Sequence, residues 1–278
     1  MRVTSTLPDT SAVSAAALAA EQAITRAGVR VQPLDTLAAV RDAAALLARV
    51  WKTDTSKPPL AAEVMRAVEH AGGYVVGAYA EEVMVGASSG FLGIADGRPV
   101  LHSHISGVVD QGRGVGLALK MHQRAWALER GISTITWTFD PLVRRNAWFN
   151  LVKLGATGVE YLPDFYGPMT DGVNGGESSD RLFTRWDLTA PPLGAIDGPR
   201  VPLLLDDVAG APAPTTCALD EAATVALRLP ADVETLRSTD PATATAWRLA
   251  VRRVLVPAFA DGFTVRGMTR DACLVLQR

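Results

Sequence analysis

The chain has 278 residues, 48% hydrophobic and 20% charged, with a net charge of −2, a composition that predicts a packed globular protein and excludes a disordered one. The pI near 6.1 and the scatter of Lys and Arg argue against nucleic acid or a membrane as the main partner, and no apolar run approaches the ~20 residues of a membrane span. Cys217 and Cys273 are expected to be reduced and buried, since a chain of this size does not need a disulfide.

The first segment, residues 1–28, is rich in alanine and predicts an N-terminal helix. Its apolar part, residues 11–20, resembles the core of a secretion signal, but Arg2 is the only basic residue before it and the acidic Asp9 lies close to its start. Gly28 follows the last turn, as is typical of a helix ended by glycine. We therefore expect a helix here and a cytoplasmic protein.

Residues 29–190 are expected to form the core domain. Strand composition at 29–34 is followed by apolar residues at helical spacing over 35–52, with Asp35 as the expected N-cap. A second helix is predicted to start after Pro58 and Pro59 and to end at Gly72 and Gly73. Strands are then predicted over 74–80, 83–94 and 100–109.

The second part of this core begins with a glycine-rich turn that opens a helix. This helix carries apolar residues on one face, with Lys120, Arg124 and Arg130 on the other, and Gly131 follows its end. The elements predicted after it are a strand over 132–140, a helix over 144–155 and a strand over 181–188.

Residues 191–215 predict a connection because they are rich in proline and glycine, with VPLLLDD as a candidate strand. Residues 216–278 predict a small α/β extension that ends in a hairpin. Its helix has Asp240 at the N-cap and Pro241 at the first position, where proline is tolerated. A solvated helix face is the interpretation favoured for Arg248, Arg252 and Arg253.

The sequence VVDQGRGVGLALK, residues 108–120, places alternating glycines where a strand turns into a helix. A dinucleotide fingerprint needs a glycine where Leu117 stands, and the preceding strand is too polar for a buried parallel one. A P-loop needs a lysine and a Ser or Thr after its last glycine, which this turn lacks. Amides that converge at a helix N-terminus suit the negative charges of a phosphate or pyrophosphate group. A tight turn without a ligand is the structural alternative.

The pattern Q/R-x-x-G-x-G/A is met by Gln111, Gly114 and Gly116, and it resembles the acyl-CoA signature of the GNAT (Gcn5-related N-acetyltransferase) superfamily. The order of predicted elements over about 29–188 is similar to that superfamily as well. The resemblance implies an α/β (α+β) acyl-CoA N-acyltransferase fold, with a mixed, mainly antiparallel sheet flanked by helices. It also implies coenzyme A contacts at Val108, Val109, Gln111, Gly112, Arg113, Gly114, Val115, Gly116, Leu117 and Asn146.

A second family signature, N-x-x-A-x-x-F-Y-x-K-x-G-F, is met in part by the helix over 144–155. Ala147, Lys153 and Gly155 match it. Leu151 stands where the family's tyrosine supplies a general acid, so the resemblance leaves this role without its usual residue.

Four stretches, LHSHISGVV, WTFDPLVRRNAWFNLVKLGA, DFYGP and SSDRLFTRWDL, resemble a GNAT subgroup that has a C-terminal extension. That subgroup is associated with N-acylation of amino acids, including by succinyl-CoA. The resemblance covers roughly residues 29–278 and implies acetyl-CoA or succinyl-CoA as donor, a small-molecule amine as acceptor and no metal. A homodimer is an open alternative to a monomer. A non-catalytic acyl-CoA-binding or regulatory module is the main rival, which the missing tyrosine favours.

His102 and His104 lie two apart on a predicted strand, so both side chains and that of Ser106 are expected on one face. An imidazole there can take a proton from an acceptor ammonium, so we expect a catalytic role for His104 and His102. A metal site is disfavoured because no third ligand is spaced nearby. A histidine hydrogen-bonded within the sheet is the alternative.

Three further residues complete the expected site. Asp140 ends a strand and is expected to anchor an amine substrate, or else to cap the next helix or pair with Arg144 or Arg145. Tyr166, on a loop, is expected to protonate the leaving thiolate in place of the missing tyrosine. Arg181 is expected to bind a carboxylate of substrate or acyl group in a bidentate manner. The amine would attack the thioester directly, with a backbone N–H near Val109 stabilising the oxyanion.

Overall fold

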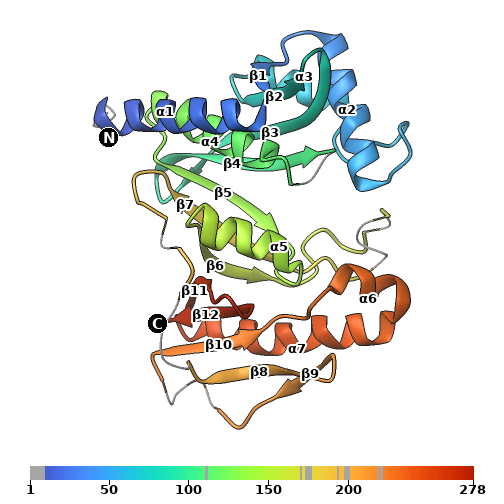
Figure 1. Cartoon of the computed structure of the whole chain (residues 1–278), viewed down its shortest axis with the longest axis vertical. Helices are drawn as coiled ribbons and strands as arrows, with labels where there is room; N and C mark the ends of the chain where they lie inside the picture. Colours follow the sequence, from blue (N-terminus) through green and yellow to red (C-terminus); the bar gives the residue numbers. More distant parts are fainter. Residues whose placement is uncertain are drawn as a thin grey trace. The chain divides into compact units, whose positions relative to one another are not determined.

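The computed structural model describes residues 10–109, 112–169, 171–172, 177–192, 194–196, 201–217, 219 and 222–278. The chain is of mixed α/β class with many, mainly antiparallel strands and flanking helices, as predicted (Figure 1). It divides into two compact units, Met1–Thr136 with Asp187–Thr189 and Trp137–Trp186 with Ala190–Arg278. The boundary between the units therefore falls within a strand, whereas the sequence analysis placed the end of the core domain at residue 190.

The first unit follows the predicted order of elements. Its strands are ordered β1-β2-β3-β4-β5, with antiparallel pairs up to β4 and a parallel pair between β4 and the start of β5. The elements are α1 (Thr10–Ala27), β1 (Arg30–Pro33), α2 (Leu37–Trp51), α3 (Ala62–His70), β2 (Tyr74–Ala80), β3 (Val83–Ala95), β4 (Arg98–Val108), α4 (Val115–Glu129) and the start of β5 (Thr134–Phe139).

Helices cover both faces of this unit's sheet. Gly107 of β4 lies against Trp51 of α2, whereas Gly86 of β3 lies against Val115 of α4. Gly86 pairs with Val108, and neighbouring strand positions point to opposite faces, so α2 and α4 cover opposite faces. The core on the α2 side is made of aliphatic residues that include Leu34, Val40, Leu47, Met65, Val75 and Ile105.

Helix α2 starts one residue later than predicted. Its N-cap is Thr36, whose hydroxyl accepts a hydrogen bond from the amide of Ala39 at 3.2 Å. The expectation of Asp35 at this position was wrong. A threonine hydroxyl satisfies an unpaired amide of the first turn as an aspartate would, so either residue could have served.

The second unit contains the end of β5 and orders its strands β5-β7-β6-β11-β12-β10-β8-β9. Residues 216–278 are part of this same unit, and β11 pairs with β6 at Val265 and Gly158. The elements are α5 (Arg144–Ala147), the π-helical turn η1 (Trp148–Lys153), β6 (Thr157–Leu162), β7 (Arg181–Asp187), β8 (Leu203–Val208), β9 (Ala211–Pro214), β10 (Thr224–Arg228), α6 (Val233–Thr239), α7 (Pro241–Ala260), β11 (Thr264–Met268) and β12 (Cys273–Gln277).

Three elements of this unit were not predicted, namely β6, β9 and α6. The prolines of β9 disguised it, but proline is tolerated on an edge strand, and β9 is the last strand in the order. Together with β8, which overlaps the predicted candidate strand over residues 203–207, it places a hairpin within residues 191–215. Helix α6 is short. Its N-cap is Asp232, whose side chain accepts a hydrogen bond from the backbone amide of Thr235.

Three findings concern the expectations on the cysteines, on membrane spans and on metal ligands. Both cysteines are free thiols, Cys273 buried and Cys217 partly exposed. Within the described ranges, no helix is long and apolar enough to cross a membrane. Among those same residues, no cluster of three or more His, Cys, Asp or Glu side chains could hold a metal ion.

Candidate functional site

The glycine turn leads from β4 into α4 and leaves the first amides of the helix uncapped. Gly114 is the N-cap residue, with φ 84°, and no side chain among the residues that the structure describes caps the helix. The amide of Ala118 makes the first helical hydrogen bond, to the carbonyl of Gly114 at 3.0 Å. The amides of Val115, Gly116 and Leu117 precede it, so α-helical geometry gives them no acceptor within the helix. Gln111 lies outside the described residues.

The space around the glycines fits a ligand that comes close to the backbone. A Cβ atom added at Gly112 or Gly116 would meet no heavy atom within 4 Å. Gly112, with φ 94°, needs glycine for its backbone conformation. Gly116 is helical and needs no such freedom, and glycine weakens a helix relative to alanine. Close approach of a ligand would explain its missing side chain, and Arg113 is exposed beside it.

The backbone at the end of β4 corrects the expected oxyanion donor. The amide of Val109 donates to the carbonyl of Val85 on β3 at 3.0 Å. It is therefore already used within the sheet. Amides alternate in direction along a strand, so the amide of Val108 points to the edge away from β3. Val108 is thus better placed than Val109 to donate to a developing oxyanion.

His102 is held by the parallel strand next to it. Its Nδ1 lies 3.1 Å from the hydroxyl of Thr136, and the two residues pair in register. Partial burial lowers the pKa of His102 to about 4, and the positive charges of His104 and Lys120 contribute. His102 is therefore neutral near pH 7 and has one nitrogen engaged in the sheet, in line with the structural alternative from the sequence.

His104 is the more exposed of the two histidines. Its ring centroid lies 5.9 Å from that of Phe91 and 6.5 Å from that of His102. Desolvation of the ring lowers the pKa of His104, so it also is neutral near pH 7. A neutral imidazole that is open to solvent can accept a proton from an amine.

The expectation that Ser106 shares the face of the histidines was wrong. A β-bulge in β4 explains this, because His102 pairs with Phe91 and Ile105 with Ser89, which leaves one extra residue on β4. The bulge reverses the alternation of side chains. Ser106 instead pairs with Ser88 and their hydroxyls lie 2.6 Å apart, on the face that α4 covers.

Lys120 is a buried residue that the sequence pattern placed on the polar face of α4. Its Nζ donates to the hydroxyl of Ser103 at 2.9 Å and to Oε1 of Gln123 at 3.2 Å. Burial lowers the pKa of Lys120 to about 7. The apolar periodicity alone gave no signal for this, since a lysine at that position fits a solvated face equally well.

In the second unit, both carboxylate oxygens of Asp140 form hydrogen bonds with arginines of the protein. Its two oxygens accept from Nη1 and Nη2 of Arg248 at 2.7 and 2.6 Å, and Arg237 donates at 2.5 Å. Burial alone would raise its pKa, but the charge and hydrogen bonds of Arg248 hold the pKa well below its usual range. Asp140 is only 7% exposed, so the expectation that it anchors an amine substrate is not supported.

The same contacts correct the interpretation of the arginines on α7. Arg248 is buried and Arg252 pairs with Asp180 at 2.5 Å, so neither lies on a solvated face. Only Arg253 is exposed as expected. The sequence could not show this, because arginines at helical spacing occur both on solvated helix faces and on faces that form buried ion pairs.

Tyr166 and Arg181 come together in this unit. The Tyr166 side chain is exposed, its hydroxyl lies 3.2 Å from that of Thr138, and the guanidinium of Arg181 lies 5.6 Å from its ring centroid. Arg181 is buried and donates to the carbonyl of Asp180 and to Sδ of Met169. Burial lowers its pKa, and the Asp140 carboxylate counteracts this shift.

Two positions on the helix over 144–155 bear on the family resemblance. Leu151 is fully buried in the core, so the position of the family's tyrosine is occupied by a packing residue. Asn146 is exposed on α5, and its backbone N–H donates to the carbonyl of Val143. Its side chain is therefore accessible, as the expected coenzyme A contact requires.

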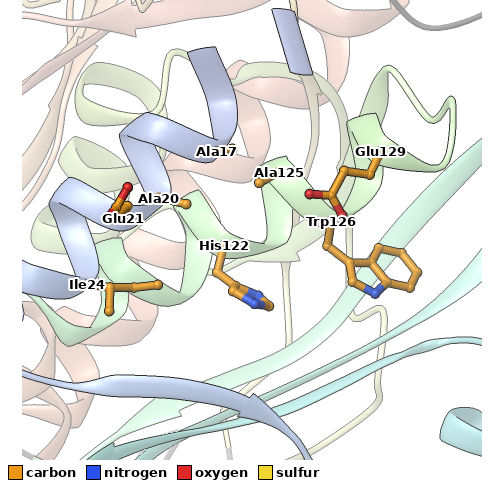
Figure 2. Close-up of a pocket in the computed structure, with 8 residues that line it drawn as sticks. All are labelled: Ala17, Ala20, Glu21, Ile24, His122, Ala125, Trp126 and Glu129. Carbon is orange, nitrogen blue, oxygen red and sulfur yellow. The ribbon is translucent and has the colours of Figure 1, made fainter. Parts of the chain in front are cut away.

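Two hollows lie in the first unit. One, of about 510 Å³, is lined by α3 and by Phe91 and Leu92, and it adjoins the histidines because Phe91 contacts both rings. The other, of about 310 Å³, lies between α1 and α4, and no predicted site residue lines it (Figure 2). In it, the rings of His122 and Trp126 extend from the same side of α4.

Comparison with known proteins finds likeness only among solved structures, since no family model and no curated protein matches the chain. The ribosomal-protein-S18-alanine N-acetyltransferase from Escherichia coli is 14% identical over 61% of this chain and 99% of that chain, with a TM-score of 0.45. An acetyltransferase of the GNAT family from Streptococcus pneumoniae is 12% identical over 56% and 97%, with a TM-score of 0.45. The aminoglycoside 6'-N-acetyltransferase from Enterococcus faecium is 16% identical over 59% and 98%, with a TM-score of 0.43. TM-scores this low leave the functional assignment to the residues of this chain.

Proposed function

We propose that this chain is an acyl-CoA-dependent N-acyltransferase, which moves an acetyl or succinyl group to the amine of a small molecule. The observation that carries the proposal is the glycine turn before α4. It combines uncapped helix amides with open space at Gly112 and Gly116. A pyrophosphate would supply acceptors for these amides, which have none within the helix.

The donor's thioester would lie along the end of β4. In this proposal the amide of Val108 donates to the carbonyl oxygen of the thioester, which becomes an oxyanion when the amine attacks. Residues Gly112 to Leu117 hold the pyrophosphate. Arg113, which is exposed, adds a polar contact to the rest of the coenzyme.

The acceptor amine would be activated by His104. The imidazole takes a proton from the ammonium, and the free amine then attacks the thioester carbon directly. The C–S bond breaks as the tetrahedral species collapses, and the nitrogen releases its second proton to solvent to give the neutral amide. Coenzyme A leaves as a thiolate that Tyr166 protonates. His102, whose Nδ1 is engaged by Thr136, lies beside His104 with a ring-centroid distance of 6.5 Å. No covalent intermediate on the protein is required.

The substrate class that we propose rests on a role for Arg181. A guanidinium in a buried environment binds a carboxylate strongly when one is offered in bidentate geometry. We propose that Arg181 binds either the free carboxylate of a succinyl group or that of an amino acid acceptor. The apolar hollow beside Phe91 would suit an acceptor with an apolar side chain.

Thermal unfolding in the presence of ligands tests the proposal. Coenzyme A, acetyl-CoA, succinyl-CoA and NAD would each be added at about 100 times the Kd, which stabilises a protein by ~2.7 kcal/mol. We expect a rise in the melting temperature with the coenzyme A series and none with NAD. No rise with any coenzyme A ligand would mean that the glycines only form a turn, and the proposal would be wrong.

A non-catalytic acyl-CoA-binding module is the second candidate, and the buried Leu151 favours it because it removes the family's usual acid. Release of free thiol from acetyl-CoA and succinyl-CoA across a panel of amines distinguishes the two. Turnover that is lost in His104→Ala supports the enzyme. Tight binding with no turnover of any amine supports the binding module.

A further inference from the structure

Asp180, just before β7, lies at the centre of a buried network in the second unit. Its side chain is fully buried, and the carboxylate accepts from Nε and Nη2 of Arg252 at 2.9 and 2.5 Å. It also accepts from the hydroxyl of Tyr161 at 2.6 Å and from the amide of Asp164 at 3.0 Å. A buried carboxylate is stable only with such partners, and Arg252 is the cation among them.

This network also holds the loop that carries Tyr166. The amide of Asp164 donates to Asp180, and the amides of Phe165 and Tyr166 donate to the carbonyl and hydroxyl of Ser179 at 3.2 and 2.7 Å. Three successive amides of the loop are therefore fixed by two neighbouring residues, Ser179 and Asp180. If Asp180 moved, the loop would lose one of these acceptors directly and the others through the adjacent backbone.

The cation in this network comes from a distant part of the chain. Arg252 lies on α7 and is separated from Asp180 by 72 residues. Burial alone would raise the pKa of Asp180, but the hydrogen bonds from Arg252 and Tyr161 lower it. The carboxylate is thus charged near pH 7 and depends on a helix that lies outside the family signatures.

We propose that Arg252 is a positioning residue, which acts through Asp180 to hold the loop 163–167 and the phenol of Tyr166 in place for acyl transfer. The inference rests on the proposed function for the role of Tyr166. It assigns a task to the C-terminal region, since α7 supplies the group without which the loop's anchor would be an unpaired buried charge.

Three variants test this placement without requiring turnover. Arg252→Gln removes the charge, Arg252→Lys keeps it without the bidentate geometry, and Arg253→Gln changes the exposed neighbour on the same helix. Phe165 and Tyr166 are exposed, so chymotrypsin cleaves the chain there once the loop opens. Cleavage is followed by mass spectrometry at a temperature well below the melting point of each variant.

We expect Arg252→Gln to raise the cleavage rate at these two sites by about tenfold or more, since a hydrogen bond to a charged group stabilises a closed loop by at least that factor. Arg252→Lys should lie between this variant and the wild type, and Arg253→Gln should match the wild type. Equal cleavage rates in folded Arg252→Gln and Arg253→Gln would overturn the proposal. If Arg252→Gln does not fold, Arg252→Lys compared with Arg253→Lys decides in the same way.

Two further measurements separate this proposal from the proposed function. The melting shift with coenzyme A should be unchanged in all three variants, because the glycine turn belongs to the other unit. Where turnover is found, Arg252→Gln should lower kcat and leave the KM for the acyl donor unchanged. Faster cleavage without any coenzyme A shift in the wild type would uphold the loop anchor and reject the acyltransferase. A coenzyme A shift with unaltered cleavage would reject the loop anchor alone.

Discussion

Arg248 donates both terminal nitrogens of its guanidinium to the two carboxylate oxygens of Asp140, although the residues are 108 positions apart in the sequence. Asp140 is 7% exposed and Arg248 is 2% exposed. This pair joins the end of β5 to the C-terminal helix α7 within the second unit. Loss of Arg248 leaves Arg237 as the remaining cation on Asp140, and loss of the Asp140 charge leaves both arginines with Glu177. Removing one partner of a buried pair in this way costs far more than the pair contributes.

We therefore expect Arg248→Met to lower the free energy of unfolding by about 3–5 kcal/mol. Asp140→Asn should have a similar effect, and the double variant should recover part of the loss. Urea unfolding of the four proteins measures these values, with Arg253→Met as an exposed control on the same helix. Losses below about 1 kcal/mol in both single variants would mean that the pair behaves like a surface salt bridge.

The same pair predicts a response to acid. The pKa of Asp140 is held below that of the unfolded state, so its contribution to stability is present above about pH 4 and is lost as the pH falls further. The double variant should lose less stability than the wild type between pH 4 and pH 2. An equal loss in both proteins would contradict this account of Asp140.

The glycine turn offers a prediction with a matched control. Gly114 and Gly131 lie at opposite ends of α4, with φ 84° and φ 71°. Alanine at either position strains the backbone, so both variants should be less stable, by roughly 1 kcal/mol. Only Gly114→Ala should also lose the melting shift with coenzyme A. If the shift were kept in Gly114→Ala, or lost equally in Gly131→Ala, the turn would not be the pyrophosphate site.

Most of the fold could be predicted because its signals are local. Asp240 and Pro241 mark the start of α7, and Gly28 and Gly131 mark the ends of two helices. These residues act through their own backbone geometry, which does not depend on what packs against them. The order of elements in the first unit follows from such signals.

The candidate site was less predictable because it depends on contacts between distant segments. The bulge in β4 places the Ser106 side chain on the opposite face of the sheet from the one expected. No residue of β4 predicts the bulge from its type alone. Arg248 fitted the pattern of a solvated helix face, and Asp140 fitted that of a residue at the end of a strand. Their ion pair is a property of tertiary packing, so periodicity and spacing could not show it.

The histidines predict the pH dependence of turnover. A base must be neutral, and desolvation lowers the pKa of His104 below its usual 6.5, so kcat/KM should fall on the acid side with a midpoint below pH 6.5. His104→Ala should lower kcat by about 10²–10⁴-fold and remove this limb. The exposed His70 of α3 serves as a control, and His70→Ala should leave the profile unchanged. A midpoint above pH 6.5, or equal effects of the two substitutions, would exclude His104 as the base.

Lys120 predicts a stability difference that changes with pH. Its pKa falls from 10.5 in the unfolded chain to about 7 in the folded protein. Between these two values the unfolded state binds more protons, so the contribution of Lys120 to stability rises with pH, and its full penalty applies below pH 7. Lys120→Met lacks this dependence. Its melting temperature relative to the wild type should therefore fall steadily as the pH rises from 7 to 10.

Lys153 provides the control for this experiment, because it is an exposed lysine. Lys153→Met removes a lysine side chain that folding does not bury, so we expect it to show no comparable trend. Melting curves of the three proteins at four pH values from 7 to 10 measure the trend. A constant difference for Lys120→Met would mean that its ammonium keeps its charge when buried, stabilised by Ser103 and Gln123. A declining difference would show that the network holds a neutral amine at alkaline pH, directly behind the strand that carries both histidines.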